Sequence, residues 1–307
     1  MATPNPAAPP LSAAQQQALA TVRQRGVQRL LTVPYAAIHI HFHPDWLHAG
    51  ASVIEHLASS GRYLSQFESG RSNGSYSPQT GGQRWQWEHD GFGGAYDAAD
   101  VSERPVYGAV DLHAFGHAQP VGYGAAPRFG SAWLQLHAGI AARSSFCDPD
   151  SYWQPQHLGV CPQMDWQQLQ CLALPDPLDH YVEAQVHGGL LLARDVAALV
   201  LDPSFADTPI AAAAQRCDVP LRWHGGYRFS NAMLAPAADY RGAEIADALQ
   251  DLLQHFGSGL GASRSLSPAD LGRAQAQSTG NQRYDAPTLK KAWHCLARFG
   301  GQPLGHP

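Results

Sequence analysis

The chain has 307 residues, of which 44% are hydrophobic, and carries a formal net charge of -5 at pH 7. A chain of this length can bury a large core, and its hydrophobic fraction is typical of a globular protein. The acidic balance excludes the basic footprint of nucleic-acid binding. No run of 18 apolar residues is present, which excludes a membrane-spanning helix. We therefore expect a globular monomer that binds neither nucleic acid nor membrane.

Two residue types are distributed unusually. The five cysteines are odd in number and form no C-x-x-C pair, so the sequence predicts reduced thiols rather than disulfides or a zinc knuckle. Lys290 and Lys291 are the only lysines among 20 basic residues. A GC-rich genome explains this bias, and avoidance of lysine by a protein that works where lysines become ubiquitinated is the alternative hypothesis.

The first elements are a tail and a helix. Residues 1–14 are rich in Pro and Ala, which predicts a disordered tail. No charged-then-apolar leader opens the chain, so Sec-type export is not expected. A helix is expected from Ser12, its N-cap, with apolar residues near helical spacing as far as Leu30 and Gly26 as a weak point.

The segment 38–43 alternates apolar residues with histidines, and a strand would place His39, His41 and His43 on one face. Pro44 ends this strand. Imidazoles in this arrangement can hold a metal ion. One of them can instead bind a ribose or phosphate, or the three can form a polar strand face with no function.

The segment after this strand predicts a short helix capped by Ser52, with Glu55 completing a capping box and Gly61 at its end. Residues 62–104 mix Gly with aromatic residues. This composition favours ordered loops whose backbone can approach a ligand closely.

Strands are expected to predominate from residue 106 to 229. The predicted strands are 106–112, 128–136, 181–188, 196–202 (a strand or the end of a helix) and 221–229. Residues 147–170 give no firm prediction. Helices are expected at 243–256, from Ser267-Pro268 onward, and at 286–299.

Polar side chains on three predicted strands follow a recognisable order: His41 and His43 first, Ser131 in the middle and Glu183 late. This order resembles the mono-ADP-ribosyltransferase superfamily. The resemblance implies an α+β fold, with an ADP-ribosyltransferase-like split β-sheet core, flanking helices and a helical C-terminal appendage. The implied domains are a catalytic domain at 15–235 and the appendage at 236–307.

A narrower resemblance covers about residues 36–230. The strings at 41–45, 66–68, 72–74, 128–131 and 183–188 together resemble the CHARM family of bacterial effectors. The resemblance implies transfer of ADP-ribose from NAD to a threonine of host ubiquitin, with release of nicotinamide and a block of ubiquitination. It also implies secretion by a bacterium into the host cytoplasm without a Sec signal peptide.

The chain departs from the family pattern at three positions. Trp46 replaces a common Arg, and Arg71 stands where a small residue is usual. The Glu-x-Glu of arginine-directed transferases is absent, because Gln185 follows Glu183. This argues against arginine as the acceptor and leaves a threonine, a serine or a nucleobase.

The resemblance also implies residue roles. The expected catalytic residues are Glu183, His41 and Ser131. The expected NAD-binding residues are His41, His43, Ser72, Asn73, Gly74, Phe129, Ser131 and Gln185. Glu183, His187 and Asp45 are open candidates for a general base. No metal is expected.

Two other function classes stay open. A metal-dependent hydrolase would use the His-x-His-x-His strand, although a barrel of that kind needs a regular strand-helix alternation that residues 62–160 lack. A non-enzymatic module would bind ubiquitin through the Trp- and Tyr-rich loops.

Overall fold

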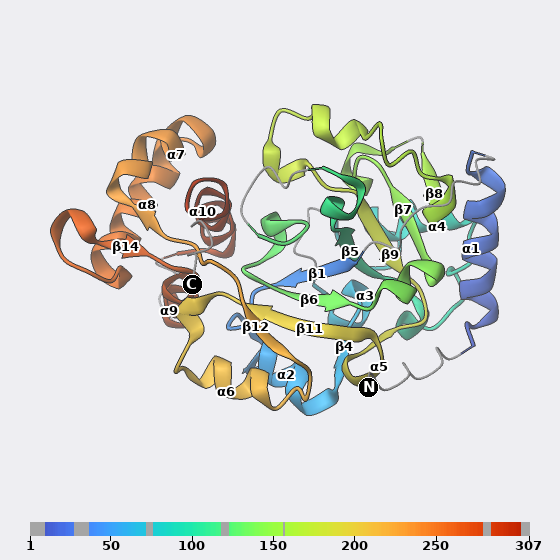
Figure 1. The fold of residues 1–307 in the computed structure, drawn as a ribbon, viewed down its shortest axis with the longest axis horizontal. Coiled ribbons are helices and arrows are strands. Elements are labelled where there is room, and N and C mark those ends of the chain that lie inside the picture. Colours follow the sequence, from blue (N-terminus) through green and yellow to red (C-terminus); the bar gives the residue numbers. More distant parts are fainter. Residues whose placement is uncertain are drawn as a thin grey trace.

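The computed structural model describes residues 10–27, 37–71, 76–117, 123–155, 157–278 and 284–301. These residues form an α+β fold in which a mixed eight-stranded sheet carries flanking helices and a C-terminal helical region (Figure 1). The predicted fold class is confirmed at this level. The strand order is β12-β11-β6-β1-β5-β9-β7-β8. Neighbouring strands are antiparallel except for the parallel pair of β11 and β12.

The eight strands are short and lie mostly where the sequence predicts them. They are β1 Ile38–Phe42, β5 Val106–Val110, β6 Ala132–Leu136, β7 Ser144–Cys147, β8 Leu158–Val160, β9 Glu183–Val186, β11 Val196–Leu201 and β12 Leu221–Trp223. Three pairs of two-residue strands lie outside the sheet: β2 Leu47–His48 with β3 Ala51–Ser52, β4 Arg62–Tyr63 with β10 Leu190–Leu191, and β13 Phe229–Ser230 with β14 Ser265–Leu266. The predicted strand 221–229 is in fact divided between β12 and β13, and β7 and β8 were not predicted.

The helices confirm most of the predicted boundaries. They are α1 Ala13–Arg25, α2 Val53–Ser60, α3 Gln66–Ser69, α4 Gln83–Phe92, α5 Leu192–Asp195, α6 Pro209–Gln215, α7 Leu234–Arg241, α8 Ala243–Phe256, α9 Pro268–Ser278 and α10 Ala286–Phe299. Ser12 and Ser52 each form the predicted N-terminal cap. Gly61, with φ 66°, ends α2 in the left-handed conformation that glycine adopts most easily. Helix α1 ends at Gly26, before the predicted end.

Helix α4 contradicts the prediction of loops throughout 62–104. Its buried residues Arg84, Glu88 and Phe92 recur at every fourth position, as one face of a helix requires. Two of the three are charged, so the buried face does not have an apolar periodicity. An analysis based on apolar spacing therefore misses this helix.

The two faces of the sheet differ in character. The main core packs on the face that carries Ile38, Ile40 and Phe42, where α2 and α6 also contribute buried residues. The opposite face carries histidines of β1 and Glu183 of β9. His39, His41 and His43 are 6%, 6% and 7% exposed, so this strand is buried on both faces. The five cysteines are buried and free.

The C-terminal helices have a separate core. Residues of α7 to α10 pack together with Tyr227 and Phe229 in a second apolar cluster, which lies beside the sheet in Figure 1. We call residues 234–299 the helical lobe. Trp293 of α10 connects this lobe to the segment that precedes β6. Its indole N–H donates to the carbonyls of Pro127 (2.9 Å) and Arg128 (3.1 Å).

Candidate functional site

A cavity of about 760 Å³ is lined by the sheet, by the helical lobe and by the segment that contains α2, β4 and α3. Strands β1, β5 and β9 form its floor, and a 3-10 turn at Pro127–Phe129, called η3, forms part of its wall together with α10. This volume lies within the range of small-molecule and cofactor sites, roughly 300–1,000 Å³. The cavity is therefore the candidate active site.

The sheet register places the predicted residues at this cavity. His39 pairs with Ala109, and Ala109 pairs with Glu183, so the first and last of these side chains lie in one row across three strands. His39, His41, His43 and Glu183 all line the cavity. His39 and Glu183, which are about 140 positions apart in the sequence, thus line the same cavity because β5 pairs with both β1 and β9.

Glu183 is held by neighbours on two sides. Its Oε1 accepts a hydrogen bond from the Gln185 side chain (2.9 Å), and its Oε2 accepts one from the Ser151 hydroxyl (2.9 Å). The guanidinium of Arg84 lies 3.9 Å from Oε1. Burial raises the pKa of Glu183, while Arg84 opposes that shift. The result is a fixed, partly desolvated carboxylate facing the cavity.

Asp150 is a second buried carboxylate at this end of the cavity, and the sequence analysis missed it. Its Oδ2 accepts a hydrogen bond from Tyr181, and among the described residues its Oδ1 has no hydrogen-bond partner. Burial raises its pKa as well. A buried oxygen without a partner is unusual in a folded protein and suggests a ligand contact.

His41 has no nitrogen left for a ligand. Its Nδ1 lies 3.0 Å from the Gly130 carbonyl, and its Nε2 lies 3.2 Å from the backbone N–H of Ala126. The ring is therefore neutral, with its proton on Nδ1. Burial lowers its pKa to about 3. Although His41 lines the cavity, its nitrogens hold the loop that leads to Ser131.

Gly130 allows this loop to lie against β1. Its φ is 155°, and a Cβ atom there would lie 2.2 Å from the backbone carbonyl of Phe42. Gly124 approaches His41 in the same way, with a virtual Cβ 2.5 Å from Nε2. The backbone packing therefore explains both glycines without a ligand.

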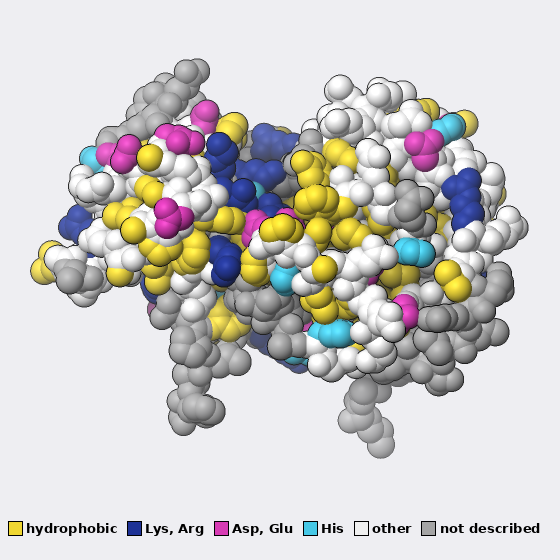
Figure 2. All heavy atoms as spheres, turned by 90° about the horizontal axis from the view of Figure 1, so that it is seen from above, with side chains coloured by type: hydrophobic (Ala, Val, Ile, Leu, Met, Phe, Trp, Pro, Cys, Tyr) yellow, Lys and Arg dark blue, Asp and Glu magenta, His cyan; other side chains and the backbone are white. Residues whose placement is uncertain are grey.

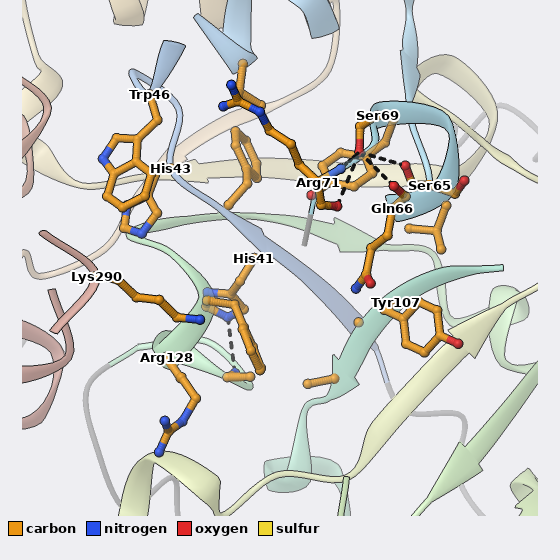
Figure 3. A pocket seen from close by; sticks show the side chains of 18 of the residues that line it. His41, His43, Trp46, Ser65, Gln66, Ser69, Arg71, Tyr107, Arg128 and Lys290 are labelled. Atoms are coloured by element: carbon orange, nitrogen blue, oxygen red, sulfur yellow. Dashed lines mark hydrogen bonds between the residues drawn. The ribbon is translucent and has the colours of Figure 1, made fainter. Parts of the chain in front are cut away.

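His43 is better placed than His41 to contact a ligand. Its ring stacks on that of Trp46, with 4.0 Å between the ring centroids (Figure 3). It also makes an edge-on contact with Trp293, with 5.0 Å between the centroids. No hydrogen bond to its nitrogens is found within the described part of the chain. Burial lowers its pKa to about 3, so it is a neutral imidazole.

The remaining predicted residues divide into three groups. Phe129 lines the cavity, whereas Ser131 and Gln185 are buried outside its lining. The Ser131 Oγ has no partner among the described residues, and Gln185 acts on Glu183 from behind. Ser72, Asn73 and Gly74 lie outside the described residues, as do residues 1–9 of the predicted tail.

The general-base candidates are also separated. Of Glu183, His187 and Asp45, only Glu183 lines the cavity. His187 is fully buried, and its two nitrogens lie within hydrogen-bond distance of Tyr96 and Ser145.

A basic wall closes the cavity on the side of the helical lobe, and the sequence analysis did not assign it to the site. Its members are Arg128, Arg241, Lys290, Lys291 and His294. Figure 2 shows basic side chains gathered in the hollow between the lobe and the sheet. The rarity of lysine was the available signal, because both lysines of the chain lie here.

Two kinds of feature are absent from the described residues. Among the residues that the structure describes, no group of three or more His, Cys, Asp or Glu side chains is arranged to hold a metal ion. No helix in these ranges is long and apolar enough to span a membrane.

Comparison with known families gives one match. The chain matches the model of DUF3626, described as a protein of unknown function, over residues 37–173 and 164–299. The matched ranges include both the sheet and the helical lobe, and the chain belongs to this family. A search of curated proteins finds no match.

Proposed function

We propose that this protein is an NAD-dependent mono-ADP-ribosyltransferase that modifies a hydroxyl group of a host protein. The observation that carries the proposal is Glu183, a buried carboxylate fixed by three side chains at one end of a cavity with a basic wall. The cavity fits NAD chemically, because a carboxylate at one end suits a developing cation and basic groups suit a diphosphate.

The reaction breaks the bond between ribose C1′ and the nicotinamide nitrogen, and nicotinamide leaves with the electron pair. Positive charge develops on the ribose, as in glycoside hydrolysis. The Glu183 carboxylate stabilises this charge and orients the ribose. The acceptor oxygen then bonds to C1′, and its proton passes to a base. Asp150 fills this role in our proposal, because its Oδ1 has no partner among the described residues.

The proposed acceptor is a threonine of ubiquitin. This part depends on the resemblance to the CHARM effectors, and one surface feature supports a protein partner. Tyr152 and Trp153 directly follow Ser151, the residue that contacts Glu183, and are 55% and 44% exposed. Exposed aromatic residues beside a site are effective anchors for a protein surface.

The test combines two readouts on the full-length protein. We expect NAD to be converted with release of nicotinamide, and ubiquitin to gain the mass of one ADP-ribose. Glu183→Gln should lower both rates by about a hundredfold or more. Glu244→Gln, an exposed substitution on α8, serves as the matched control and should leave the rates unchanged.

The pH profile gives an independent check. Only the ionised form of Glu183 stabilises the cation, so the rate should fall as the pH is lowered through its pKa. Because burial raises this pKa, the acid limb should lie above the ordinary range of glutamate. Full activity of a folded Glu183→Gln protein would refute the mechanism. Nicotinamide release without modified ubiquitin would remove ubiquitin as the acceptor.

A further inference from the structure

The basic wall combines residues from distant parts of the chain. Arg128 comes from η3, Arg241 from the end of α7, and Lys290 from α10. Figure 3 places Lys290 and Arg128 on the same side of the cavity as the stacked pair of His43 and Trp46. The helical lobe thus supplies cations to a cavity that is also lined by the carboxylates of Glu183 and Asp150.

The basic wall gathers several cations around two carboxylates. Arg128 pairs with Asp176 and Asp179, each at 2.7 Å, and Arg241 lies 3.3 Å from Asp176. Lys290 and Lys291 line the cavity beside these ion pairs. Burial and then the two arginines lower the pKa of Lys290. Gathering like charges in a half-buried place costs free energy, which a bound anion would offset.

His294 provides a hydrogen-bond donor at the same wall. A nitrogen of Arg241 donates to its Nδ1 over 3.2 Å, so the neutral ring carries its proton on Nε2. His294 is 6% exposed, and within the described ranges this Nε2 is buried without a partner. The Nε atoms of Arg128 and Arg241 are likewise buried without a hydrogen-bond partner among the described residues. Three donors without acceptors indicate that an acceptor is missing.

The composition of the chain points to the same wall. Of its 20 basic residues, only Lys290 and Lys291 are lysines, and both line the cavity. The two lysines are consecutive residues of α10, and this helix brings both to the cavity. The lysine ammonium is a compact charge at the end of a flexible side chain, whereas the arginine guanidinium presents its N–H donors in one plane. Both groups bind phosphate.

We propose that Arg128, Arg241, Lys290 and His294 bind the pyrophosphate of a dinucleotide. The helical lobe is then half of the substrate site, rather than an appendage to it. The choice of a dinucleotide rests on the proposed function, whereas the affinity for pyrophosphate itself follows from the wall.

The test measures binding by calorimetry, without any reaction. Full-length protein is titrated with ADP-ribose, with inorganic pyrophosphate and with adenosine, which has no phosphate. We expect Lys290→Gln to weaken binding of ADP-ribose and of pyrophosphate by about tenfold, as for the loss of one charge-assisted contact. Arg241→Gln should act in the same direction. Adenosine binding should not respond to either substitution.

Arg298→Gln is the matched control, because it removes a charge from the same helix outside the cavity lining. It should bind all three compounds as the unmodified protein does. The proposal is overturned if folded Lys290→Gln and Arg241→Gln proteins bind ADP-ribose normally, or if the unmodified protein binds neither phosphate compound. Pyrophosphate binding that depends on Lys290, with no release of nicotinamide from NAD, would support the anion site and count against only the proposed transferase.

Discussion

At the scale of single residues, the site depends on a neutral imidazole. A proton added to His41 would place an N–H opposite the backbone N–H of Ala126, so protonation must break a contact. The pKa of His41 falls from 6.5 to about 3 because the ring is buried. Below pH 6.5 the unfolded chain binds a proton that the folded chain does not. The free energy of unfolding therefore decreases as the pH falls from 6.5 toward 3.

This linkage gives a prediction for stability. Between pH 7 and pH 5.5, His41 should lower the free energy of unfolding by about 1 kcal/mol, because the unfolded side chain becomes largely charged. His41→Gln removes this contribution, so its stability should decrease less over the same interval, whatever its stability at pH 7. His157→Gln, at an exposed position outside the cavity lining, is the matched control for the loss of an imidazole. Urea unfolding at both pH values measures the difference, and parallel slopes for all three proteins would contradict the prediction.

At the scale of elements, the sequence predicts those whose signals are local. The boundaries of α2 follow from Ser52 and Gly61, and β1 follows from the alternation of histidine with apolar residues. Glu183 is expected at the site from the resemblance to the ADP-ribosyltransferases, and it lines the cavity. Helix α4 was missed because Arg84 and Glu88 are buried through polar contacts, which leave no apolar period.

The basic wall could not be assembled from the sequence for a different reason. Lys290 meets Arg128 only because α10 docks on η3, and that contact joins segments more than 160 residues apart. Periodicity places each residue on its own element but does not show which elements pack together. The sequence shows that lysine is rare, but it does not show that Lys290 and Lys291 lie at the cavity.

The docking of α10 leads to a prediction for that element. Trp293→Phe keeps an aromatic ring but removes the N–H that donates to Pro127 and Arg128, so it should destabilise the fold by about 1–2 kcal/mol. It should also weaken binding of ADP-ribose, because it loosens the helix that carries Lys290. Trp166→Phe is the matched control: its N–H also donates to a backbone carbonyl, that of Cys161, but the residue lies outside α10 and supports no element of the basic wall. The control should lose similar stability and keep its affinity. Equal affinities for the two variants would argue against a role of α10 in binding.

At the scale of the whole molecule, two apolar cores lie on either side of the cavity. The sheet core and the core of the helical lobe are separate clusters, and the family match extends over both. Between them lie buried or half-buried charges that stabilise neither core by hydrophobic contact. This arrangement resembles sites at domain interfaces, where a ligand completes the contact between two folded parts.

A ligand that bridges the two parts should stabilise them together. At a concentration one hundred times its dissociation constant, ADP-ribose should raise the free energy of unfolding by about 2.7 kcal/mol. Because the proposed contacts come from both sides, hydrogen exchange should slow in α10 and in the segment of η3 at the same time. In Lys290→Gln, at the same ligand concentration, protection of α10 should decrease most. Protection confined to the sheet in the unmodified protein would mean that the ligand does not reach the helical lobe, and that the basic wall serves another anion.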